Sequence, residues 1–390
     1  MQNTRVLISG ASIAGPSLAY WLHRYGFDVT VIEKAPEVRR AGQAVDFKGP
    51  IHLGVLSRMG ILDTVRGAAS PTEDGLIVNA AGRKIATSPG ALFGGDIEIP
   101  RGDLARILYD LTADSCEYIF GDTITSLAET GDGVDVTFAH APARTFDLVI
   151  GADGMHSTVR KLAYGPEKDY VRHLGYYYVL ADLDVQSDQV MYSEPGRTVI
   201  LGGPKASAFF VFASSELPPA RDNVDLQKQQ VMDAFRGGSW RIPELLERMP
   251  AAKEFYLDSI SRATVDRYSR GRVALLGDAA WGNALGGFGT GLAVVGAYVL
   301  AGELFRADGD HRTAFAQFEN IYRAYASVAE KVNGGTMLAP TTRNGIRFRN
   351  LAMTMLSKIA PLVKLVERPA KANLTLENYD DDPERRNTPW

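Results

Sequence analysis

The chain opens with two short apolar runs separated by a segment of helical spacing. Residues 6–8 form a continuous apolar run, residues 29–32 are apolar except for Thr30, and residues 14–25 place apolar side chains at helical intervals before Gly26. Continuous apolar runs are typical of strands buried on both faces, and glycine commonly ends a helix. The second run ends at Glu33. The pattern therefore predicts strand–helix–strand with tight turns, the unit from which parallel sheets are built.

The region up to residue 150 mixes polar stretches with short apolar runs. Glycine, arginine and polar residues dominate residues 35–50, which predicts a loop. The last predicted strand, residues 146–150, leads directly into a glycine-rich turn at 151–154. The other expected elements are helices at 53–65 and 101–112, a hairpin at 75–85 that turns at 80–82, and three short strands between 117 and 150.

The pattern changes after residue 170. Residues 273–276 repeat the buried-strand pattern of the N-terminus, and a long helix is predicted from Gly291. The rest of the chain is predicted to be mostly helical, with a loosely ordered tail from Leu376. Before these, we expect antiparallel strands at 176–183, 197–201 and 209–212, and helices at 224–236 and 243–249.

Glycine-rich strand ends near residues 10, 153 and 278 organise the chain. Because β-rich sequence separates the last two, we expect an α/β protein with a mixed β-sheet domain inserted into a Rossmann-like cofactor domain. The expected domains are a discontinuous cofactor domain at 1–170 and 265–330, a β-rich substrate domain at 171–264, a C-terminal helical region at 331–375 and a tail at 376–390.

Composition and charge exclude several classes of function. The 390 residues carry a net charge of −4, so no basic field attracts nucleic acid or anionic lipid. The single cysteine, Cys116, permits no internal disulfide or paired-cysteine site, and the six histidines are scattered. The chain begins with a strand pattern rather than a signal peptide, and no apolar run reaches the roughly 18 residues of a membrane span. We expect a cytoplasmic monomer or weak homodimer without nucleic-acid or membrane partners.

The turn after the first strand is the first candidate for binding chemistry. Residues 10–15 read Gly-Ala-Ser-Ile-Ala-Gly, with Ser12 where a dinucleotide fingerprint has its middle glycine. Serine is small, its hydroxyl can reach a phosphate, and the helix beyond presents free N–H groups. Glu33 can accept hydrogen bonds from ribose hydroxyls and disfavours a 2′-phosphate. These features predict FAD or NAD binding, although a tight turn in an unrelated α/β protein has the same glycines.

Two later glycine-rich turns have both a structural and a functional interpretation. Asp153 and Arg160 flank a predicted helix N-cap at Ser157, which is also a common strand–turn–helix connection. Asp278 follows a predicted strand and can accept from a sugar-chain hydroxyl. Residues 286–291 open a helix whose N–H groups can face an electron-rich ring edge, and a flexible linker has the same composition.

The three motifs, in this order and spacing, resemble the group A flavoprotein monooxygenases, the single-component aromatic hydroxylases. The resemblance covers about residues 4–330, and residues 42–49 and 100–104 are similar to the tetracycline-inactivating, antibiotic-modifying branch. It implies an FAD-dependent monooxygenase that uses NADPH or NADH and O2 to hydroxylate an aromatic or polycyclic small molecule through a flavin C4a-hydroperoxide. The cofactor supplies this chemistry, so neither a metal nor a catalytic triad is expected.

The resemblance also implies positions around the cofactor. Asp153 and Arg160 match a motif that the family uses for both FAD and NADPH. The substrate should lie between flavin and β-rich domain, with Tyr178, Phe210 and Phe212 as candidate walls, although only alternate residues of a strand face one side. The residues expected on FAD are Gly10, Ser12, Ile13, Ala14, Gly15, Glu33, Lys34, Asp46, Arg101, Asp153, Arg160, Gly277 and Asp278, with Gly289, Thr290 and Gly291 beside the flavin ring.

The chain also departs from the family pattern. Residues 281–285 lack the prolines that usually form a floor beneath the reactive ring edge, and Thr290 begins a stretch without the usual Asn or Gln. Baeyer–Villiger oxygenation or dehydrogenation on the same fold, and a non-catalytic flavin-binding protein, remain alternatives. The pairs Arg39–Arg40 and Arg347–Arg349, like His156, are expected on solvated surfaces.

Overall fold

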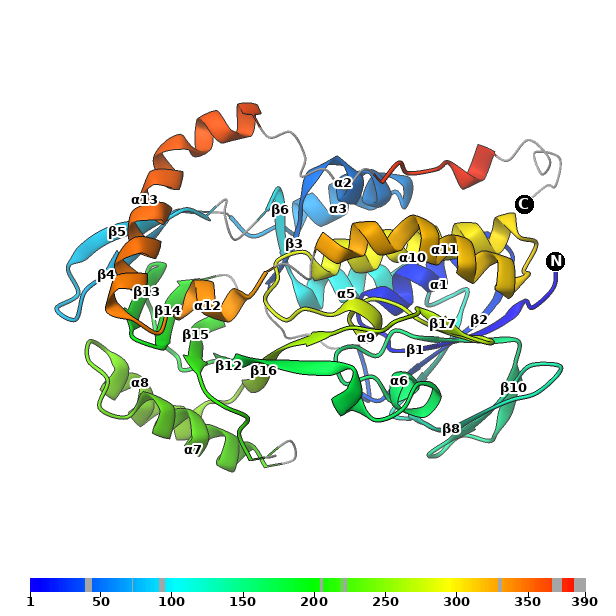
Figure 1. Cartoon of the computed structure of the whole chain (residues 1–390), viewed down its shortest axis with the longest axis horizontal. Helices are drawn as coiled ribbons and strands as arrows, with labels where there is room; N and C mark the ends of the chain where they lie inside the picture. Colours follow the sequence, from blue (N-terminus) through cyan, green and yellow to red (C-terminus); the bar gives the residue numbers. More distant parts are fainter. Residues whose placement is uncertain are drawn as a thin grey trace.

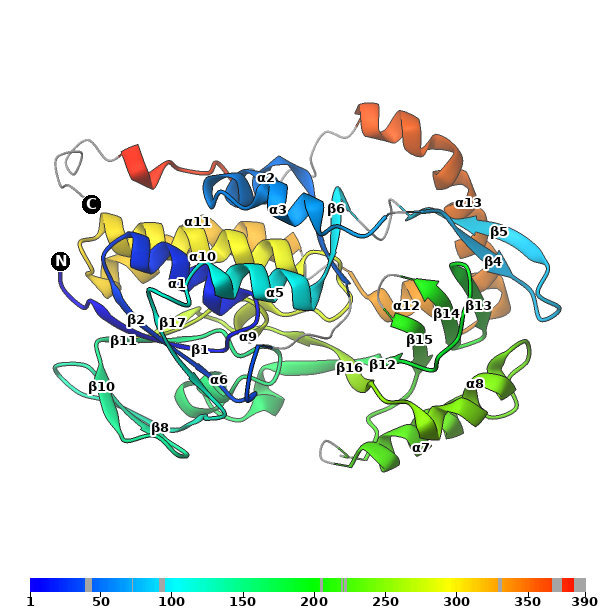
Figure 2. The same cartoon turned by 180° about the vertical axis from the view of Figure 1, so that it is seen from behind.

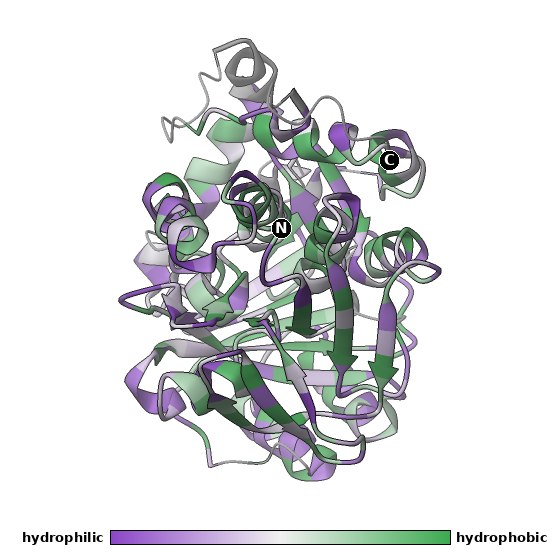
Figure 3. Cartoon of the chain, turned by 90° about the vertical axis from the view of Figure 1, so that its right-hand side faces the viewer, coloured by the Kyte–Doolittle hydropathy of each residue, from purple (hydrophilic) through white to green (hydrophobic). Residues whose placement is uncertain are grey.

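The first strands of the chain belong to a sheet of mainly parallel strands. The computed structural model describes residues 1–38, 44–71, 73–90, 95–203, 206–218, 220, 223–328, 332–366 and 374–381. In spatial order the six strands are β17 (Ser269–Arg270), β18 (Val273–Leu275), β11 (Leu148–Gly151), β1 (Arg5–Ser9), β2 (Asp28–Glu33) and β7 (Glu117–Phe120). β1 pairs in parallel with β2 and with β11, which confirms the predicted strand–helix–strand unit. The central strands are buried on both faces, and Figure 3 shows their hydrophobic character.

Helices cover this parallel sheet on both faces. α1 (Ala14–Arg24) packs on α10 (Gly289–Arg306), and α10 packs on α11 (His311–Ala326). Figure 1 shows these helices and α5 (Arg101–Asp110) stacked over one face, with α6 (Thr158–Ala163) on the other. Nearly all residues of α10 are buried, and the helix is accordingly apolar on nearly every face. Within the described residues, none of the helices has the length and apolar character needed to cross a bilayer.

The second layer is a seven-stranded sheet. Its order is β16 (Phe255–Ala263), β12 (Val171–Ala181), β15 (Ala206–Ala213), β14 (Arg197–Gly203), β13 (Val190–Glu194), β4 (Gly75–Val78) and β5 (Lys84–Ser88). α7 (Val224–Phe235) and α8 (Ile242–Arg248) cover one face, as Figure 2 shows from behind. α12 (Gly334–Leu338) and α13 (Arg343–Val366) lie against the other face. The strands and helices predicted after residue 170 are confirmed.

Three local expectations before residue 150 are wrong. Residues 35–50 are not all loop, because β3 (Ala44–Phe47) pairs with β6 (Ile97–Pro100). The helix expected at 53–65 is two helices, α2 (Gly49–Arg58) and α3 (Leu62–Gly67), since Gly60 adopts a φ of 74° between them. The three strands expected between 117 and 150 are five, because β8 (Ile124–Glu129), β9 (Val134–Phe138) and β10 (Arg144–Phe146) form a separate sheet.

The hairpin predicted around residue 80 forms, but it belongs to the other sheet. β4 and β5 turn where Gly82 donates its N–H to Asn79 O, and β4 then pairs in parallel with β13. This hairpin was expected in the cofactor domain, because pairing between segments more than 100 residues apart leaves no local signal in the sequence. The hairpin instead extends the sheet that faces the cofactor region.

The start of the predicted tail is packed rather than loose. The Tyr379 ring lies over α10 at Gly302, where an added Cβ would be 2.2 Å from the ring. The Tyr379 hydroxyl donates to the buried Glu303 carboxylate at 2.7 Å. Arg58 also donates to the Leu376 carbonyl. Residues 374–381 therefore pack against α10 and α2. Residues 382–390 lie outside the described residues.

Candidate active site

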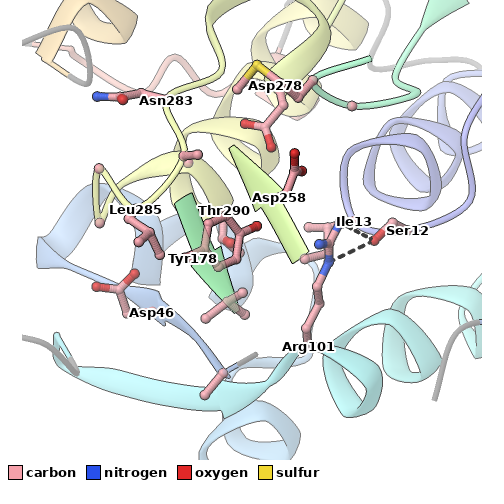
Figure 4. Close-up of a pocket in the computed structure, with 18 of the residues that line it drawn as sticks. Ser12, Ile13, Asp46, Arg101, Tyr178, Asp258, Asp278, Asn283, Leu285 and Thr290 are labelled. Atoms are coloured by element: carbon pink, nitrogen blue, oxygen red, sulfur yellow. Dashed lines mark hydrogen bonds between the residues drawn. The ribbon is translucent and has the colours of Figure 1, made fainter. Parts of the chain in front are cut away.

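One cavity of about 1580 Å³ lies between the two main sheets. At one end it is lined by the turn that follows β1, including Gly10 and Ser12. At the other end it is lined by apolar residues of the seven-stranded sheet, including Phe209. Figure 4 shows Asp278, Arg101 and Tyr178 projecting into the space between these ends. This position, at the carboxyl ends of parallel strands, is where open α/β sheets bind ligands.

The two glycines of the first motif are required by close backbone approach. Gly10 has a φ of 111°, and a Cβ there would lie 2.4 Å from Ala152 O. A Cβ on Gly15 would lie 1.8 Å from Gly10 O. The N-cap residue of α1, Ile13, offers no side-chain cap, and the first turn of the helix has no acidic residue. The turn thus presents unobstructed N–H groups and a positive helix end to the cavity.

Ser12, which replaces the middle glycine, is tied to a distant arginine. Arg101, the first residue of α5, donates to Ser12 Oγ from Nε at 3.2 Å and from Nη2 at 3.1 Å (Figure 4). Both side chains line the cavity. A fixed guanidinium beside a helix N-terminus attracts phosphate, because its fork of donors matches phosphate oxygens.

Glu33 is held in place by two backbone amides. Its Oε2 accepts from Ala11 N at 2.8 Å and its Oε1 from Ala35 N at 2.9 Å. Each oxygen keeps a lone pair that can accept from a ribose hydroxyl. Glu33 and the exposed Lys34 both line the cavity.

The second motif is divided between cavity and core. Asp153 lines the cavity, yet its carboxylate also accepts from Thr158 N at 2.7 Å and caps α6 with Ser157. Burial raises the pKa of Asp153 although these hydrogen bonds oppose the rise. Arg160 is fully buried, does not line the cavity, and donates to Ala279 O at 2.8 Å and to Met155 O. Its side chain connects the second and third motifs within the core, outside the lining of the cavity. Its expected contact with the cofactor is therefore not supported.

The third motif projects a carboxylate into the cavity. Gly277 turns with a φ of 64°, and Asp278 begins α9 (Asp278–Trp281). Asp278 lines the cavity, and no described residue donates a hydrogen bond to its carboxylate. Burial raises its pKa although Arg101 opposes the rise. Gly289 and Thr290 also line the cavity, whereas Gly277 and Gly291 do not.

Two residues that sequence analysis did not single out support this loop. Lys48 pairs with Asp46 at 2.7 Å and donates to Gly287 O at 3.1 Å. His52 accepts from Lys48 N at 3.0 Å, and a Cβ on Gly291 would lie 2.1 Å from its ring. Burial and the nearby Lys48 charge lower the pKa of His52 to about 4, so its ring is neutral. The only sequence feature near them was the run at residues 42–49, which ends where α2 begins.

His156 is neither on a helix nor on an open surface. It lies in the turn before α6, lines the cavity, and contacts Glu167 at 3.0 Å and Asp258 at 3.4 Å. Asp258 also accepts from the Tyr256 hydroxyl at 2.8 Å. Burial lowers the pKa of His156, but the hydrogen bonds to Asp258 and Glu167 outweigh it and raise the pKa to about 9. The contact between His156 and Asp258 joins the second motif to β16.

The opposite end of the cavity is apolar. Tyr178 lines it as expected, but Phe210 and Phe212 point to the other face of β15, where both contact Phe235 of α7. Phe209 faces the cavity instead, because neighbouring residues of a strand alternate between faces. The loop that lacks prolines contributes Leu285, which adopts a φ of 57°. Other apolar side chains of this wall are Met191, Ile200, Leu257, Met337, Leu338 and Leu356.

The polar end of the cavity fits the ADP half and linker of FAD. Gly10 and Gly15 let the turn close tightly, because a Cβ at either position would meet backbone atoms, and Gly10 and Ser12 line the cavity where a pyrophosphate would bind. The Arg101 guanidinium suits phosphate, while Glu33 and Asp278 offer acceptors for sugar hydroxyls. Of the sixteen residues expected on the cofactor, Gly15, Arg160, Gly277 and Gly291 do not line the cavity, and the other twelve do.

Comparison with known proteins agrees with this geometry. The family model described as "FAD binding domain" matches residues 3–311. A flavin-dependent monooxygenase of Legionella longbeachae is 32% identical, over 97% of this chain and 99% of the relative. The crystal structure of tetracycline destructase Tet(55) is 33% identical with a TM-score of 0.77, over 92% of this chain and 97% of that one. Tet(51) is 27% identical with a TM-score of 0.79, over 97% of this chain and 100% of that one.

Both the family match and the relatives extend well beyond the first dinucleotide motif. They include the Asp278 turn, which projects a carboxylate into the same cavity as Ser12 and Arg101. The chain therefore belongs to the FAD-binding-domain family and is a flavin-dependent monooxygenase of group A.

Proposed function

We propose that the protein uses NADPH or NADH together with O2 to hydroxylate an aromatic or polycyclic small molecule. The observation that carries this proposal is the continuity of the cavity. One space of about 1580 Å³ joins the polar turn at Gly10 to the apolar wall at Phe209. A cofactor held at the polar end would thus meet a substrate at the apolar end without crossing solvent.

The residues at the polar end would hold FAD. We assign Gly10, Ser12 and the first N–H groups of α1 to the pyrophosphate, with Arg101 beside it. We assign Glu33 to the adenosine ribose and Asp278 to the sugar-chain segment, because each has acceptor capacity that faces the cavity. Bound FAD would supply the reaction with electrons accepted from the nicotinamide and with activation of O2.

The apolar end would orient the substrate and exclude water. Phe209, Met191 and Leu338 offer side chains without hydrogen-bonding groups, and a dry wall suppresses hydrolysis and proton leakage from reactive species. Leu285 and Thr290 bring the third motif to the same space. The Lys48–Asp46 pair would fix the glycine loop between cofactor and substrate, since Lys48 donates to Gly287 O.

The lining favours a large substrate with few polar groups. In the apolar wall the polar side chains are sparse; Gln189 and Asn283 are among them. Mostly apolar walls bury a large part of an apolar ligand, and a few polar groups fix its orientation. The similarity to tetracycline destructases supports a polycyclic substrate for this chain as well.

Steady-state oxidation of NADPH and NADH tests the proposal. The purified holoenzyme is assayed with a panel of phenols, anthraquinones and tetracyclines, and O2 uptake is recorded in parallel. We expect a member of the panel to accelerate both NADPH oxidation and O2 uptake and to yield a product with an added oxygen. Reduction of substrate without O2 uptake would instead indicate a dehydrogenase. A yellow protein that neither nicotinamide reduces would be a flavin-binding protein without turnover.

A further inference from the structure

The outer face of α13 is an exposed apolar stripe. The side chains of Phe348, Leu351 and Met355 are 75%, 54% and 55% exposed. Positions three and four apart in a helix lie on one face, so these three side chains form a continuous row. α13 runs along the edge of the molecule, away from the parallel sheet (Figures 1 and 2). The row therefore faces solvent over about two helical turns.

The stripe is not a poorly packed core face, because the opposite face of α13 is anchored. Arg349, Asn350 and Met353 are buried against the seven-stranded sheet and α12. Arg349 donates to Ser193 Oγ at 2.9 Å, and Thr354 Oγ1 accepts from the backbone of Thr87 on β5. Helical geometry then directs Phe348, Leu351 and Met355 outward.

The charge of α13 is opposite to that of the whole chain. Residues 343–366 contain five cationic residues and no Asp or Glu, although the net charge is −4. Arg343, Arg347 and Lys358 are exposed, and none pairs with a carboxylate in the described part of the chain. The average charge, on which the expectation of no attraction to anionic lipid rested, conceals this local reversal. An exposed apolar row flanked by unpaired cations matches a surface that is both apolar and anionic.

A second copy of the chain fits this stripe poorly. Two copies meeting stripe to stripe would bring like charges together, with no carboxylate on either helix to neutralise them. Three apolar side chains also fall short of the roughly 800 Å² per partner that a stable interface buries. Spanning is excluded as well, since α13 is not apolar enough to cross a bilayer.

We propose that α13 docks the protein on an anionic membrane surface. Phe348, Leu351 and Met355 insert at the boundary between headgroups and acyl chains, while Arg347 and Lys358 contact lipid phosphates. Leu356, next to Met355, lines the cavity. The docked helix thus places one wall of the cavity beside the lipid surface, where apolar molecules partition. Docking requires no turnover, so it stands or falls separately from the proposed reaction.

Cosedimentation of the holoenzyme with lipid vesicles tests the proposal. Vesicles of phosphatidylcholine alone are compared with vesicles that also contain phosphatidylglycerol, and the flavin absorbance of each variant confirms that it is folded. We expect binding at least about tenfold tighter to the anionic vesicles, weakening as salt rises. Arg347→Glu with Lys358→Glu, and separately Met355→Glu, should each reduce that binding at least about tenfold.

The matched control is Leu226→Glu, which introduces the same charge at an exposed leucine on α7, where Leu226 is 42% exposed. This variant should bind as the wild type does. Equal affinity for both kinds of vesicle, no binding to either, or equal loss in the α7 variant would overturn the proposal. So would a concentration-dependent dimer that Leu351→Glu abolishes, because the stripe would then be a contact between copies.

Discussion

Arg101 donates two hydrogen bonds to the hydroxyl of Ser12, from Nε at 3.2 Å and from Nη2 at 3.1 Å. The serine that departs from the three-glycine fingerprint thus fixes the guanidinium that faces the proposed pyrophosphate position. The residue that departs from the sequence motif therefore makes a side-chain contact in the folded protein, and we propose that this contact serves FAD binding. It also joins the turn before α1 to the start of α5, and these two helices pack on each other.

Restoring the missing glycine should weaken FAD binding. Ser12→Gly removes the acceptor that holds Arg101, and a hydrogen bond to a charged group is worth about 1.5–3 kcal/mol. We expect the Kd of the apoprotein for FAD to rise about tenfold, measured by fluorescence titration. Ser17→Ala on α1 is the control, because no described residue bonds to the Ser17 hydroxyl. Equal or tighter FAD binding by Ser12→Gly would contradict the assigned contact.

Gly15 should not tolerate a methyl group. Gly15→Ala places a Cβ 1.8 Å from Gly10 O, a backbone atom that cannot rotate away. We expect a loss of more than about 3 kcal/mol in the free energy of unfolding, or failure to fold, measured by urea denaturation. Gly67→Ala at the end of α3 has no atom within 4 Å of the new Cβ, and should change stability by less than about 1 kcal/mol. Similar effects of the two substitutions would show that the turn is not closely packed.

Neighbouring phenylalanines of β15 should have separable roles. Phe210→Ala empties a core position against Phe235 and should cost about 3–5 kcal/mol of stability without changing substrate preference. Phe209→Leu should keep most of the stability but change KM across a panel of polycyclic substrates, since Phe209 lines the cavity. Urea midpoints and KM values measure the two effects. A changed preference in the Phe210 variant alone would reverse the assignment of faces.

Stability should fall with rising pH in a way that depends on His156. The folded-state pKa is raised from 6.5 to about 9, after hydrogen bonds to Asp258 and Glu167 outweigh burial. A raised pKa stabilises the fold fully below 6.5, and that contribution is lost as pH rises through about 9. Relative to His156→Gln, the wild type should therefore lose free energy of unfolding across this window. If urea denaturation gave the same dependence of the free energy of unfolding on pH for both proteins, the result would exclude a charged His156 in the folded state.

The sequence predicted the features that local patterns encode. The β1–α1–β2 unit and the turn at Gly277 follow from apolar runs next to glycine, and the helix at Arg101–Asp110 was also predicted. The three motifs predicted one shared cofactor site through their resemblance to the flavoprotein monooxygenases, and in the structure the carboxyl ends of parallel strands bring them together. Most residues expected on FAD accordingly line the cavity.

The features that the sequence did not predict depend on which face of a strand a side chain occupies and on contacts between distant segments. Phe210 and Phe209 are equally aromatic, and only the register of β15 decides which one reaches the cavity. Arg160 belongs to a conspicuous motif but turns inward to two carbonyls. Lys48 and His52 precede or begin α2, and their role depends on a loop more than 200 residues away. Single-sequence patterns contain no information on such pairings.

The most direct test of the central claim is the source of the oxygen atom in the product. The polycyclic compound that most accelerates NADPH oxidation is incubated with holoenzyme under oxygen-18 gas, and the product mass is recorded. We predict incorporation of one oxygen-18 atom, because oxygen transfer in the apolar cavity draws on O2 rather than on water. A product labelled only in oxygen-18 water, or no oxygenated product with all consumed O2 recovered as hydrogen peroxide, would contradict the assignment of monooxygenation to this cavity.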